Sequence, residues 1–275
     1  MADKIALSAG VRSNLLSLQS TTKFIGTTQT RLSSGLKVNS ALDDASAFFT
    51  SVALSNRGSD LSALKSDIDL SVSTLEAAIN GIDGITDLVQ QAKGLANQAK
   101  ATGDTNEKST LSVQFNALLT QIDDLANDSS FNGTNLIQAT PDTLTVEFNE
   151  DGTSDLTITG LDSTTGANGL NVAAATNSFG DDASINVSLT AINSALTELR
   201  TNAATLGSNS SVLQTRLSFT ADLVNTLDTG AGKLTLADLN EESANLLALQ
   251  TRQQLGINSL SLASQSERSI LALFG

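Results

Sequence analysis

The chain has 275 residues, a formal net charge of −14, 40% hydrophobic residues and only 3% aromatic residues. It contains no Cys and no His, which excludes disulfide bonds, thiolate or imidazole metal ligands, and acid–base catalysis by histidine. The acidic balance argues against nucleic acids and anionic membranes as partners, and an interior of aliphatic side chains favours a mainly α fold of packed helices.

No stretch of the sequence approaches the roughly 18 consecutive apolar residues of a membrane span, so we expect no membrane insertion. The N-terminal stretch MADKIALSAGVRSNLLSLQS also lacks the uninterrupted apolar segment of a conventional signal peptide. These features indicate a soluble protein without a cleaved signal peptide, either cytosolic or exported by a route that needs none.

Residues from about 5 to 34 have the pattern of a helix with a weak heptad repeat. One seam position repeats every seven residues, at Val11, Leu18, Ile25 and Leu32. The second seam position is expected at Leu15, Thr22, Gln29 and Leu36. Because helix stability comes mainly from the packing of an apolar face, a half-polar seam predicts that this helix needs a partner.

The stretch RLSSGLKVNSALDD, residues 31–44, predicts a break between two helices. Gly35 is the natural left-handed stop of the first helix. Ser40 is expected to be the N-cap of the next helix, with Asp43 completing a capping box. Asp44 adds negative charge to the first turn, where the helix dipole favours it.

The middle of the chain is predicted to be two helices followed by a β-rich segment. Helical patterns run from 41 to about 100, where Gly81 and Gly84 are the expected bend points, and from about 110 to 127. Residues 129–184 are rich in Asn, Gly, Thr and Ser, and they contain TLTVEF and DLTITGL joined by NEDGTS, which predicts a β-hairpin. The polar side chains of this segment fit either a solvated loop or attachment points for surface glycans.

The C-terminal part returns to a helical pattern near Ile185, with an interruption expected at TGAGK (229–233) and a last helix from about Leu236. A chain that runs out through helices, turns in the middle and returns through helices brings both termini to the same end.

The last helix carries apolar residues on more than one face. One stripe contains Ala248, Leu255 and Leu262, and another contains Leu246, Leu249 and Leu260. A helix that is apolar on several sides must be surrounded, and one other terminal helix cannot surround it. We therefore predict that both terminal segments pack against further copies of the chain and are disordered in the monomer. The predicted polymerisation residues are Val11, Leu15, Leu18, Ile25, Leu32 and Leu36 in the N-terminal arm, and Leu246, Leu249, Leu255, Leu260, Leu262 and Ile270 in the C-terminal arm.

The paired carboxylates at 43–44, 123–124 and 241–242 are candidates for acid–base chemistry or Ca²⁺ binding. Adjacent helical residues point about 100° apart, so no pair converges by itself. The turn NEDGTSD lacks the ligand alternation and the closing Glu of an EF-hand loop. We expect no catalytic, metal or cofactor site.

Several motifs resemble bacterial flagellins, the subunits of the flagellar filament. RLSSGLKVNSALDDAS is similar to the N-terminal signature of that family, and SSFNGTNLI is similar to the segment where the family core gives way to a variable middle. QTRLSFTADLVNTL and ESANLLALQTRQQLGINSLSLASQSERSILALFG resemble the C-terminal half. The resemblance covers roughly residues 1–138 and 185–275.

This resemblance implies a domain organisation and a function. Residues 1–40 and 234–275 would form an inner coiled-coil polymerisation domain, 41–131 and 185–233 a helical filament domain, and 132–184 a small variable outer domain. The break at Gly35, Ser40, Asp43 and Asp44 would be the spoke between the inner and outer parts. The implied function is a self-assembling filament subunit for swimming motility, located outside the cell and exported by the flagellar type III route. The implied partners are other copies of the chain, flagellar junction and cap proteins, the export apparatus and an export chaperone.

One segment departs from flagellins of the enterobacterial type. Where those carry an Arg- and Glu-containing patch read by a vertebrate innate immune receptor, this chain has QQAKGLANQAK, with Lys93 and Gly94 near the charged positions. Loss of the acid and of the bidentate Arg predicts no strong activation of that receptor.

Three alternatives differ from the filament hypothesis in what they predict. A hook–filament junction protein shares similar terminal arms but caps a short ring. A cytosolic helical-bundle signalling protein would have stable terminal helices in the monomer and no export. A secreted enzyme housed in 132–184 has no candidate catalytic residues.

Overall fold

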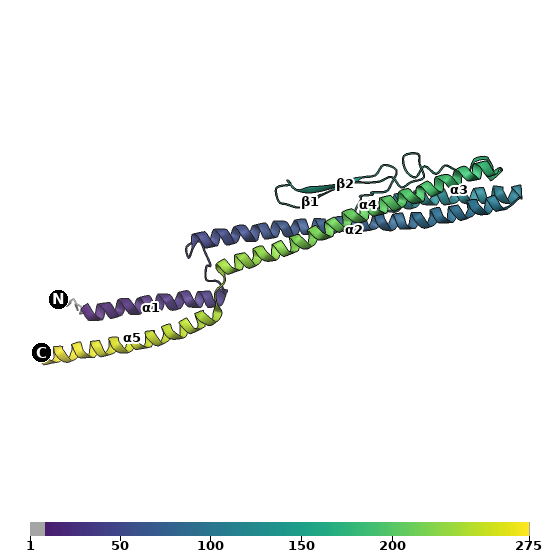
Figure 1. Ribbon diagram of the computed structural model, residues 1–275. Coiled ribbons are helices and arrows are strands. Elements are labelled where there is room, and N and C mark those ends of the chain that lie inside the picture. The colour runs from purple at the N-terminus through teal and green to yellow at the C-terminus, as the bar shows by residue number, and fades with distance from the viewer. Residues whose placement is uncertain (1–8, 275) are drawn as a thin grey trace. The chain divides into compact units, whose positions relative to one another are not determined.

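The computed structural model describes the backbone of residues 9–274 and the side-chain environments of residues 9–269. The mainly α fold predicted from the sequence is confirmed, with one small antiparallel sheet of two strands (Figure 1). The elements in chain order are α1 (Ala9–Ser34), α2 (Ala45–Ala101), α3 (Thr105–Asp128), β1 (Thr143–Glu147), β2 (Asp155–Thr159), η1 (Thr176–Phe179), α4 (Asp182–Thr235) and α5 (Leu239–Phe274).

The two long helices are less interrupted than the sequence predicts. Gly81 and Gly84 lie inside the continuous helix α2, and the segment TGAGK (229–233) lies inside α4, so the interruption expected there is wrong. Tertiary packing overrides the weak helix propensity of glycine at this point. Ala231 is buried, and its carbonyl accepts a hydrogen bond of 3.3 Å from the hydroxyl of Ser51.

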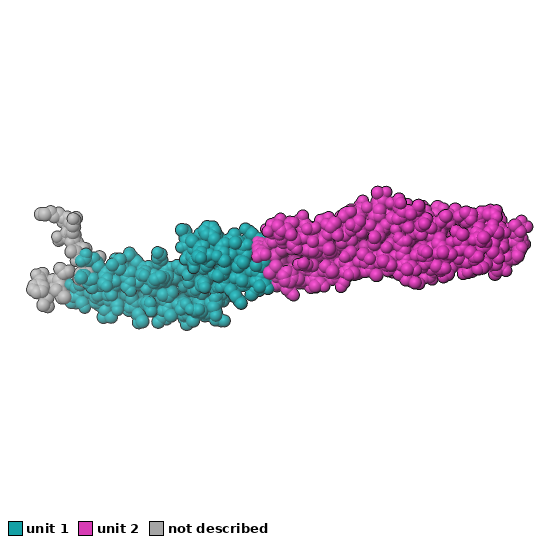
Figure 2. Space-filling view, turned by 45° about the horizontal axis from the view of Figure 1, so that its top comes forward, with its two compact units in different colours: residues 1–56, 226–275 teal, residues 57–225 magenta. Residues whose placement is uncertain are grey.

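The chain forms two compact units (Figure 2). Unit 1 comprises residues 1–56 and 226–275, and unit 2 comprises residues 57–225. The three-part division by role that the sequence suggested remains a prediction. Each unit is described separately below.

In unit 1, α1 packs along α5 as an antiparallel pair (Figure 1). The segments that follow α1 and precede α5 are joined by backbone hydrogen bonds. The amide of Lys37 donates to the carbonyl of Thr235 (2.7 Å), and the amide of Ala237 donates to the carbonyl of Gly35 (2.9 Å). The beginning of the first helix and the end of the last one therefore lie at the same end of this pair, as the sequence pattern indicated (Figure 1).

In unit 2, the segment between α3 and α4 packs onto the helices and shares their hydrophobic core. The predicted β-hairpin is present, with Thr143 opposite Thr159 and Glu147 opposite Asp155. The core residues of this segment are Leu136, Ile137, Val146, Ile158, Leu170, Val172 and Phe179. The ring of Phe179 meets that of Phe115 in an edge-to-face contact with 5.2 Å between centroids. Residues 132–184 are therefore integral to the packing of unit 2.

Two arginines hold the tip of the hairpin against the helices. The Arg57 Nε atom of α2 lies 2.7 Å from the Glu150 carboxylate, and the Arg216 guanidinium of α4 lies 4.8 Å from the centre of the Phe148 ring. The pKa of Glu150 lies below its ordinary value. The main cause is a hydrogen bond from its own backbone amide, and the hydrogen bond from Arg57 adds to it.

Candidate polymerisation surface

The seam between α1 and α5 uses the first predicted heptad position. Val11 and Ile25 are buried, and Leu18 and Leu32 are half-buried. The second predicted position is wrong at three of its four residues, because Thr22 and Gln29 are exposed and Leu15 is 36% exposed, whereas Leu36 is half-buried.

The second position of the seam falls one residue earlier, on polar side chains. Thr21 and Thr28 are 5% and 6% exposed, and Asn14 is half-buried. The Thr21 hydroxyl donates to the Ser17 carbonyl at 2.9 Å, so the helix itself satisfies this buried hydroxyl. A prediction of the seam from hydrophobicity alone therefore places Leu15 in it, whereas α5 covers the threonines.

Helix α5 presents one apolar stripe to α1 and carries another that stays largely exposed. Leu246, Leu249 and Leu260 are half-buried, whereas Leu255 and Leu262 are 62% and 66% exposed. The two stripes predicted from the sequence are therefore separate faces in the structure. Ile270 lies outside the residues whose side chains the structure describes.

Gly256 allows close contact between the two helices. A Cβ atom at this position would lie 3.2 Å from the Leu18 Cδ1 atom. Glycine in the middle of a helix costs about 1 kcal/mol relative to alanine, so its presence here is explained by the approach of Leu18.

The pair leaves a substantial apolar area uncovered, which we call the outer apolar surface. Its members are Leu15, Leu16, Phe24, Leu247, Leu255, Ile257 and Leu262. Leu16, Phe24, Leu247 and Ile257 were not among the predicted polymerisation residues. The signal that could have found them is the presence of large apolar residues off the heptad positions.

Two polar contacts fix the antiparallel register of the pair. The Arg31 Nη1 atom lies 3.1 Å from the Glu242 Oε1 atom, and the Glu242 side chain is largely buried. The Gln253 amide donates to the Thr22 hydroxyl at 3.3 Å. Glu242 of the carboxylate pair at 241–242 is thus the ion-pair partner of Arg31.

The break between α1 and α2 is a tightly hydrogen-bonded turn. Gly35 has φ of 72°, and its amide donates to the Arg31 carbonyl at 2.8 Å, which is the predicted left-handed helix end. The Asp43 carboxylate accepts from the amides of Asn39 and Ser40. These backbone hydrogen bonds, that of Ser40 first, lower the pKa of Asp43.

The predicted start of the second helix is wrong by several residues. Helix α2 begins at Ala45. The Asp44 carboxylate caps it by accepting a hydrogen bond of 3.0 Å from the Ala47 amide in the first turn. Ser40 and Asp43 still make the side-chain contact of a capping box, but they close a turn before the helix. Asp44 prevails because its carboxylate lies three residues before a free amide of the first helical turn.

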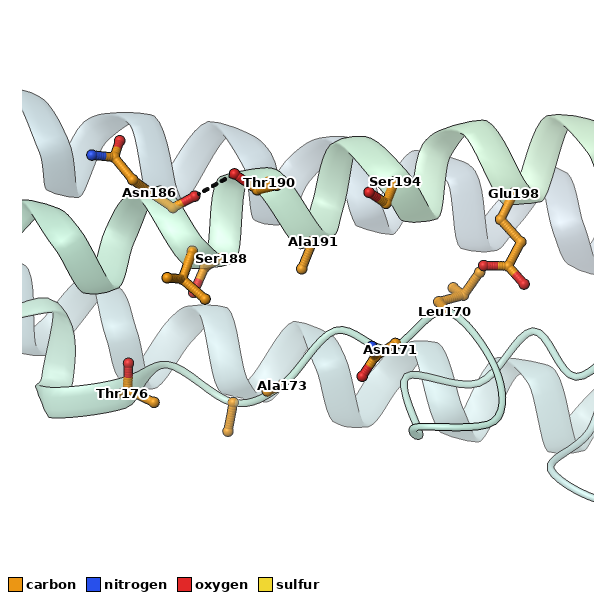
Figure 3. A pocket seen from close by; sticks show the side chains of 12 residues that line it. Leu170, Asn171, Ala173, Thr176, Asn186, Ser188, Thr190, Ala191, Ser194 and Glu198 are labelled. Atoms are coloured by element: carbon orange, nitrogen blue, oxygen red, sulfur yellow. Dashed lines mark hydrogen bonds between the residues drawn. The ribbon is translucent and has the colours of Figure 1, made fainter.

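A groove in unit 2 lies between α4 and residues 170–176 (Figure 3). It has a volume of about 700 Å³, and its lining combines apolar side chains such as Leu170 and Val187 with hydroxyls, amides and the carboxylate of Glu198. The Thr190 hydroxyl is already bonded to the Asn186 carbonyl at 2.8 Å, and Lys100 donates to the Asn186 side chain. Among the described lining residues, no hydrogen bond joins a hydroxyl to the Glu198 carboxylate, which is the arrangement that an activated nucleophile needs.

The structure also places the other residues that the sequence singled out, namely Asp123, Lys93 and Gly94. The Asp123 carboxylate accepts from the amide and hydroxyl of Thr165 at 2.7 and 2.9 Å. Among the described residues there is no cluster of side chains able to hold a metal ion, and no helix long and apolar enough to cross a membrane. Lys93 is half-buried, and Gly94 is exposed beside a groove that Leu95 and Leu118 also line.

Comparisons with known proteins agree with the resemblance seen in the sequence. The bacterial flagellin N-terminal helical region matches residues 9–142, and the bacterial flagellin C-terminal helical region matches residues 189–274. Flagellin FljM of Caulobacter vibrioides is 36% identical over 273 residues, covering 99% of this chain and 98% of the relative. A flagellin of Brucella melitensis is 30% identical over 268 residues, covering 94% and 95%. A crystal structure of Bacillus cereus flagellin aligns with 56% of this chain and 88% of its own, with a TM-score of 0.49 and 19% identity.

Proposed function

The chain belongs to the bacterial flagellin family, and from this premise we propose how it assembles as a subunit of the flagellar filament. The α1/α5 pair is the polymerisation element, and neighbouring subunits cover its outer apolar surface. The observation that carries this proposal is the second apolar stripe of α5, where Leu255 and Leu262 are 62% and 66% exposed.

The energy available from this surface is comparable with the cost of association. Covering a leucine or phenylalanine contributes about 1.5–3 kcal/mol, so the seven members of the outer apolar surface offer on the order of 10 kcal/mol per subunit. Association costs about 4–15 kcal/mol in lost translational and rotational freedom. The surface is therefore of the size that polymerisation needs, and α1 and α5 become stably folded only when neighbours cover them.

The filament lies outside the cell, and we propose that the subunit reaches it through the flagellar type III route without a cleaved signal peptide. The expected partners are the junction and cap proteins at the two ends of the filament and an export chaperone that covers the apolar termini before assembly. With Lys93 and Gly94 in place of the charged patch of enterobacterial flagellins, we expect no strong activation of the vertebrate innate immune receptor.

Seeded growth observed by electron microscopy tests the proposal. Purified wild-type chain should extend short filament fragments, and the double variant Leu255→Gln, Leu262→Gln should not. The matched control is Gln250→Ala, Gln265→Ala, which changes two exposed polar residues of the same helix and should extend seeds normally. Normal growth of the leucine variant would contradict the proposed role of α5.

A further inference from the structure

Three asparagines of unit 2 are each followed by glycine, namely Asn80, Asn132 and Asn168, and the structure holds them in different surroundings. In an Asn-Gly pair the backbone nitrogen of the glycine can approach the side-chain carbonyl carbon of the asparagine, because glycine has no Cβ atom to hinder it. The three pairs share this chemistry, so the local structure decides which of them can react.

Asn132 and Gly133 are the two central residues of an exposed turn that follows α3. The Phe131 amide donates to the Thr134 carbonyl at 2.9 Å, and the Thr134 amide donates to the Phe131 carbonyl at 3.0 Å. Both central residues have positive φ, 50° for Asn132 and 83° for Gly133, as a type I′ turn requires. Among the residues that the structure describes, neither the Gly133 amide nor the Asn132 side chain has a hydrogen-bond partner.

Rotation of a single peptide unit brings the reacting atoms of this turn together. A type II′ turn keeps the positive φ of its first central residue and has ψ of about −120° there. A five-membered ring between the Asn132 side chain and the Gly133 nitrogen requires ψ near that value. Gly133 tolerates the accompanying change of its own φ, and a Cβ atom at this position would meet nothing within 4 Å, so the rotation has room.

The pair at Asn168 is held away from this geometry by its own loop. The Gly169 amide donates to the Gly166 carbonyl at 3.1 Å. A Cβ atom at Gly169 would lie 2.5 Å from the Thr164 carbonyl oxygen, so backbone packs closely against this glycine. Ring closure at Asn168 therefore requires a hydrogen bond to break and the loop to move.

The pair at Asn80 lies inside a long helix. Gly81 belongs to α2 (Ala45–Ala101), and a Cβ atom there would lie 2.7 Å from the Ile137 Cδ1 atom. The helical hydrogen bonds and this close packing must both be lost before the Gly81 nitrogen can turn toward the Asn80 side chain. Ring closure at Asn80 therefore requires local unfolding of α2.

We propose that Asn132 is a site of spontaneous deamidation, with water as the other reactant. The Gly133 nitrogen loses its proton to a base in the solvent and forms a bond to the Asn132 Cγ atom. The bond between Cγ and Nδ2 breaks, and the side-chain nitrogen takes a proton from water and leaves as ammonia. The reaction needs no neighbouring subunit, so this site goes beyond the proposed function and does not depend on it.

Hydrolysis of the ring then gives two products. Addition of water at Cγ yields aspartate, whereas addition at the main-chain carbonyl carbon of residue 132 yields isoaspartate, whose backbone is longer by one carbon atom. Either product places a carboxylate in the turn that leads from α3 into the β-rich segment. Isoaspartate also changes the backbone between Phe131 and Thr134, which the two hydrogen bonds of the turn now join.

Peptide mapping of the full-length chain tests the proposal. The chain is incubated in mildly alkaline buffer made with heavy-oxygen water, once under native conditions and once in guanidinium chloride. It is then digested with pepsin in acid, which suppresses the reaction during preparation. Chromatography with mass spectrometry separates the aspartate and isoaspartate peptides, and incorporated heavy oxygen marks the molecules that reacted during the incubation.

We expect native conversion at Asn132 to be at least about tenfold faster than at Asn168 or Asn80, because only the last two pairs must first break hydrogen bonds. In guanidinium chloride the three rates should agree within about threefold, since unfolding leaves three copies of the same dipeptide. The folded and unfolded samples thus separate the effect of structure from that of sequence. Equal native rates at the three sites would overturn the proposal.

Gly133→Ala tests whether the backbone nitrogen is the nucleophile. The added Cβ atom hinders its approach, so conversion at Asn132 should slow at least about tenfold, with Asn80 and Asn168 as unchanged controls in the same sample. Thr110→Ala, at an exposed position of α3, is the matched control variant and should convert at the wild-type rate. An unchanged rate in Gly133→Ala, or aspartate without any isoaspartate in the wild-type chain, would show direct hydrolysis of the side chain and would overturn the ring mechanism.

Discussion

Asn135, in the motif SSFNGTNLI, shows how one buried side chain can organise a segment of unit 2. It is 3% exposed, and its amide group donates to the carbonyls of Ala126 and Asn127 at 2.8 and 2.9 Å. Its side-chain oxygen accepts from the amides of Ile137 and Gln138 at 2.9 and 3.1 Å. One residue therefore ties the end of α3 to the loop that enters the core.

Replacing Asn135 by alanine leaves these backbone groups without partners. Each unsatisfied buried group costs about 1–3 kcal/mol, so we expect Asn135→Ala to lower the free energy of unfolding of unit 2 by about 3 kcal/mol. Urea denaturation followed by circular dichroism measures this. The control Asn168→Ala, at an exposed asparagine of the same segment, should change stability by less than about 0.5 kcal/mol. Equal effects of the two changes would contradict the role of Asn135.

Two glycines of α2 give opposite predictions for the same substitution. A Cβ atom at Gly81 would clash with the Ser129 hydroxyl and lie 2.7 Å from the Ile137 Cδ1 atom, whereas a Cβ atom at Gly94 would meet nothing within 4 Å. Gly81→Ala should therefore destabilise unit 2 by about 1–3 kcal/mol through overpacking. Gly94→Ala should stabilise it by about 1 kcal/mol through helix propensity. Thermal unfolding of both variants tests the pair, and a stabilising Gly81→Ala would show that the loop packs differently.

At the scale of elements, helix α4 begins at a capping carboxylate. Asp181 accepts from the Ser184 amide at 2.7 Å and from the Asn177 side chain at 2.8 Å. These hydrogen bonds, with the backbone bond of Ser184 first, lower the pKa of Asp181 below its ordinary value of 3.8. A carboxyl whose pKa is lower in the folded state stabilises that state above pH 3.8 and loses this contribution as the pH falls through the lowered pKa.

We therefore expect the start of α4 to fray only below about pH 3.8 in the wild-type chain. Asp181→Asn removes the charge that the helix dipole favours, so it should fray the same turn at neutral pH. Carboxyl carbon chemical shifts, followed through an acid titration, give the midpoint for Asp181. A midpoint at or above the ordinary value would contradict the capping role.

The elements also show which features the sequence could predict. The helices follow from apolar residues at three- and four-residue steps, and the single proline, Pro141, lies in a loop where it interrupts none of them. The failures share a cause, which is that local patterns do not report tertiary neighbours. The glycines of 229–233 stay helical because α2 packs on them, and Thr21 and Thr28 are buried because α5 lies over them.

The two faces of α5 could be predicted from the sequence, whereas the polar half of the seam on α1 could not. The exposed stripe with Leu255 and Leu262 is separated around the helix from the one with Leu246 and Leu249, so the helical period alone distinguishes them. Which polar positions α5 would cover on α1 depends on the register of the pair. That register is fixed by the contact of Arg31 with Glu242, which is distant in sequence.

At the scale of the whole molecule, all of the net charge lies in unit 2, and this predicts how ionic strength affects assembly. Like charges on adjacent subunits repel within a Debye length, which is about 30 Å at 0.01 M salt and about 8 Å at 0.15 M. The critical concentration for seeded growth should therefore fall as NaCl rises between these concentrations.

A variant with fewer charges on α2 provides the control for this prediction. Asp60→Asn, Glu76→Gln and Asp87→Asn together remove three exposed carboxylates, so growth of the triple variant should depend less on salt. Sedimentation of polymer at each salt concentration measures both chains. A critical concentration that rises with NaCl would show that attraction between opposite charges dominates the contacts between subunits.

In the proposed function, the terminal helices depend on neighbouring subunits for cover. Hydrogen exchange of the amides in 11–32 and 246–262 tests it most directly, with dilute monomer compared with filament. We predict that these amides exchange at least about a hundredfold more slowly in the filament, while those of the buried core of unit 2 around Phe115 and Ile192 exchange alike in both states. Full protection of the terminal amides in the dilute monomer would contradict this dependence on neighbouring subunits.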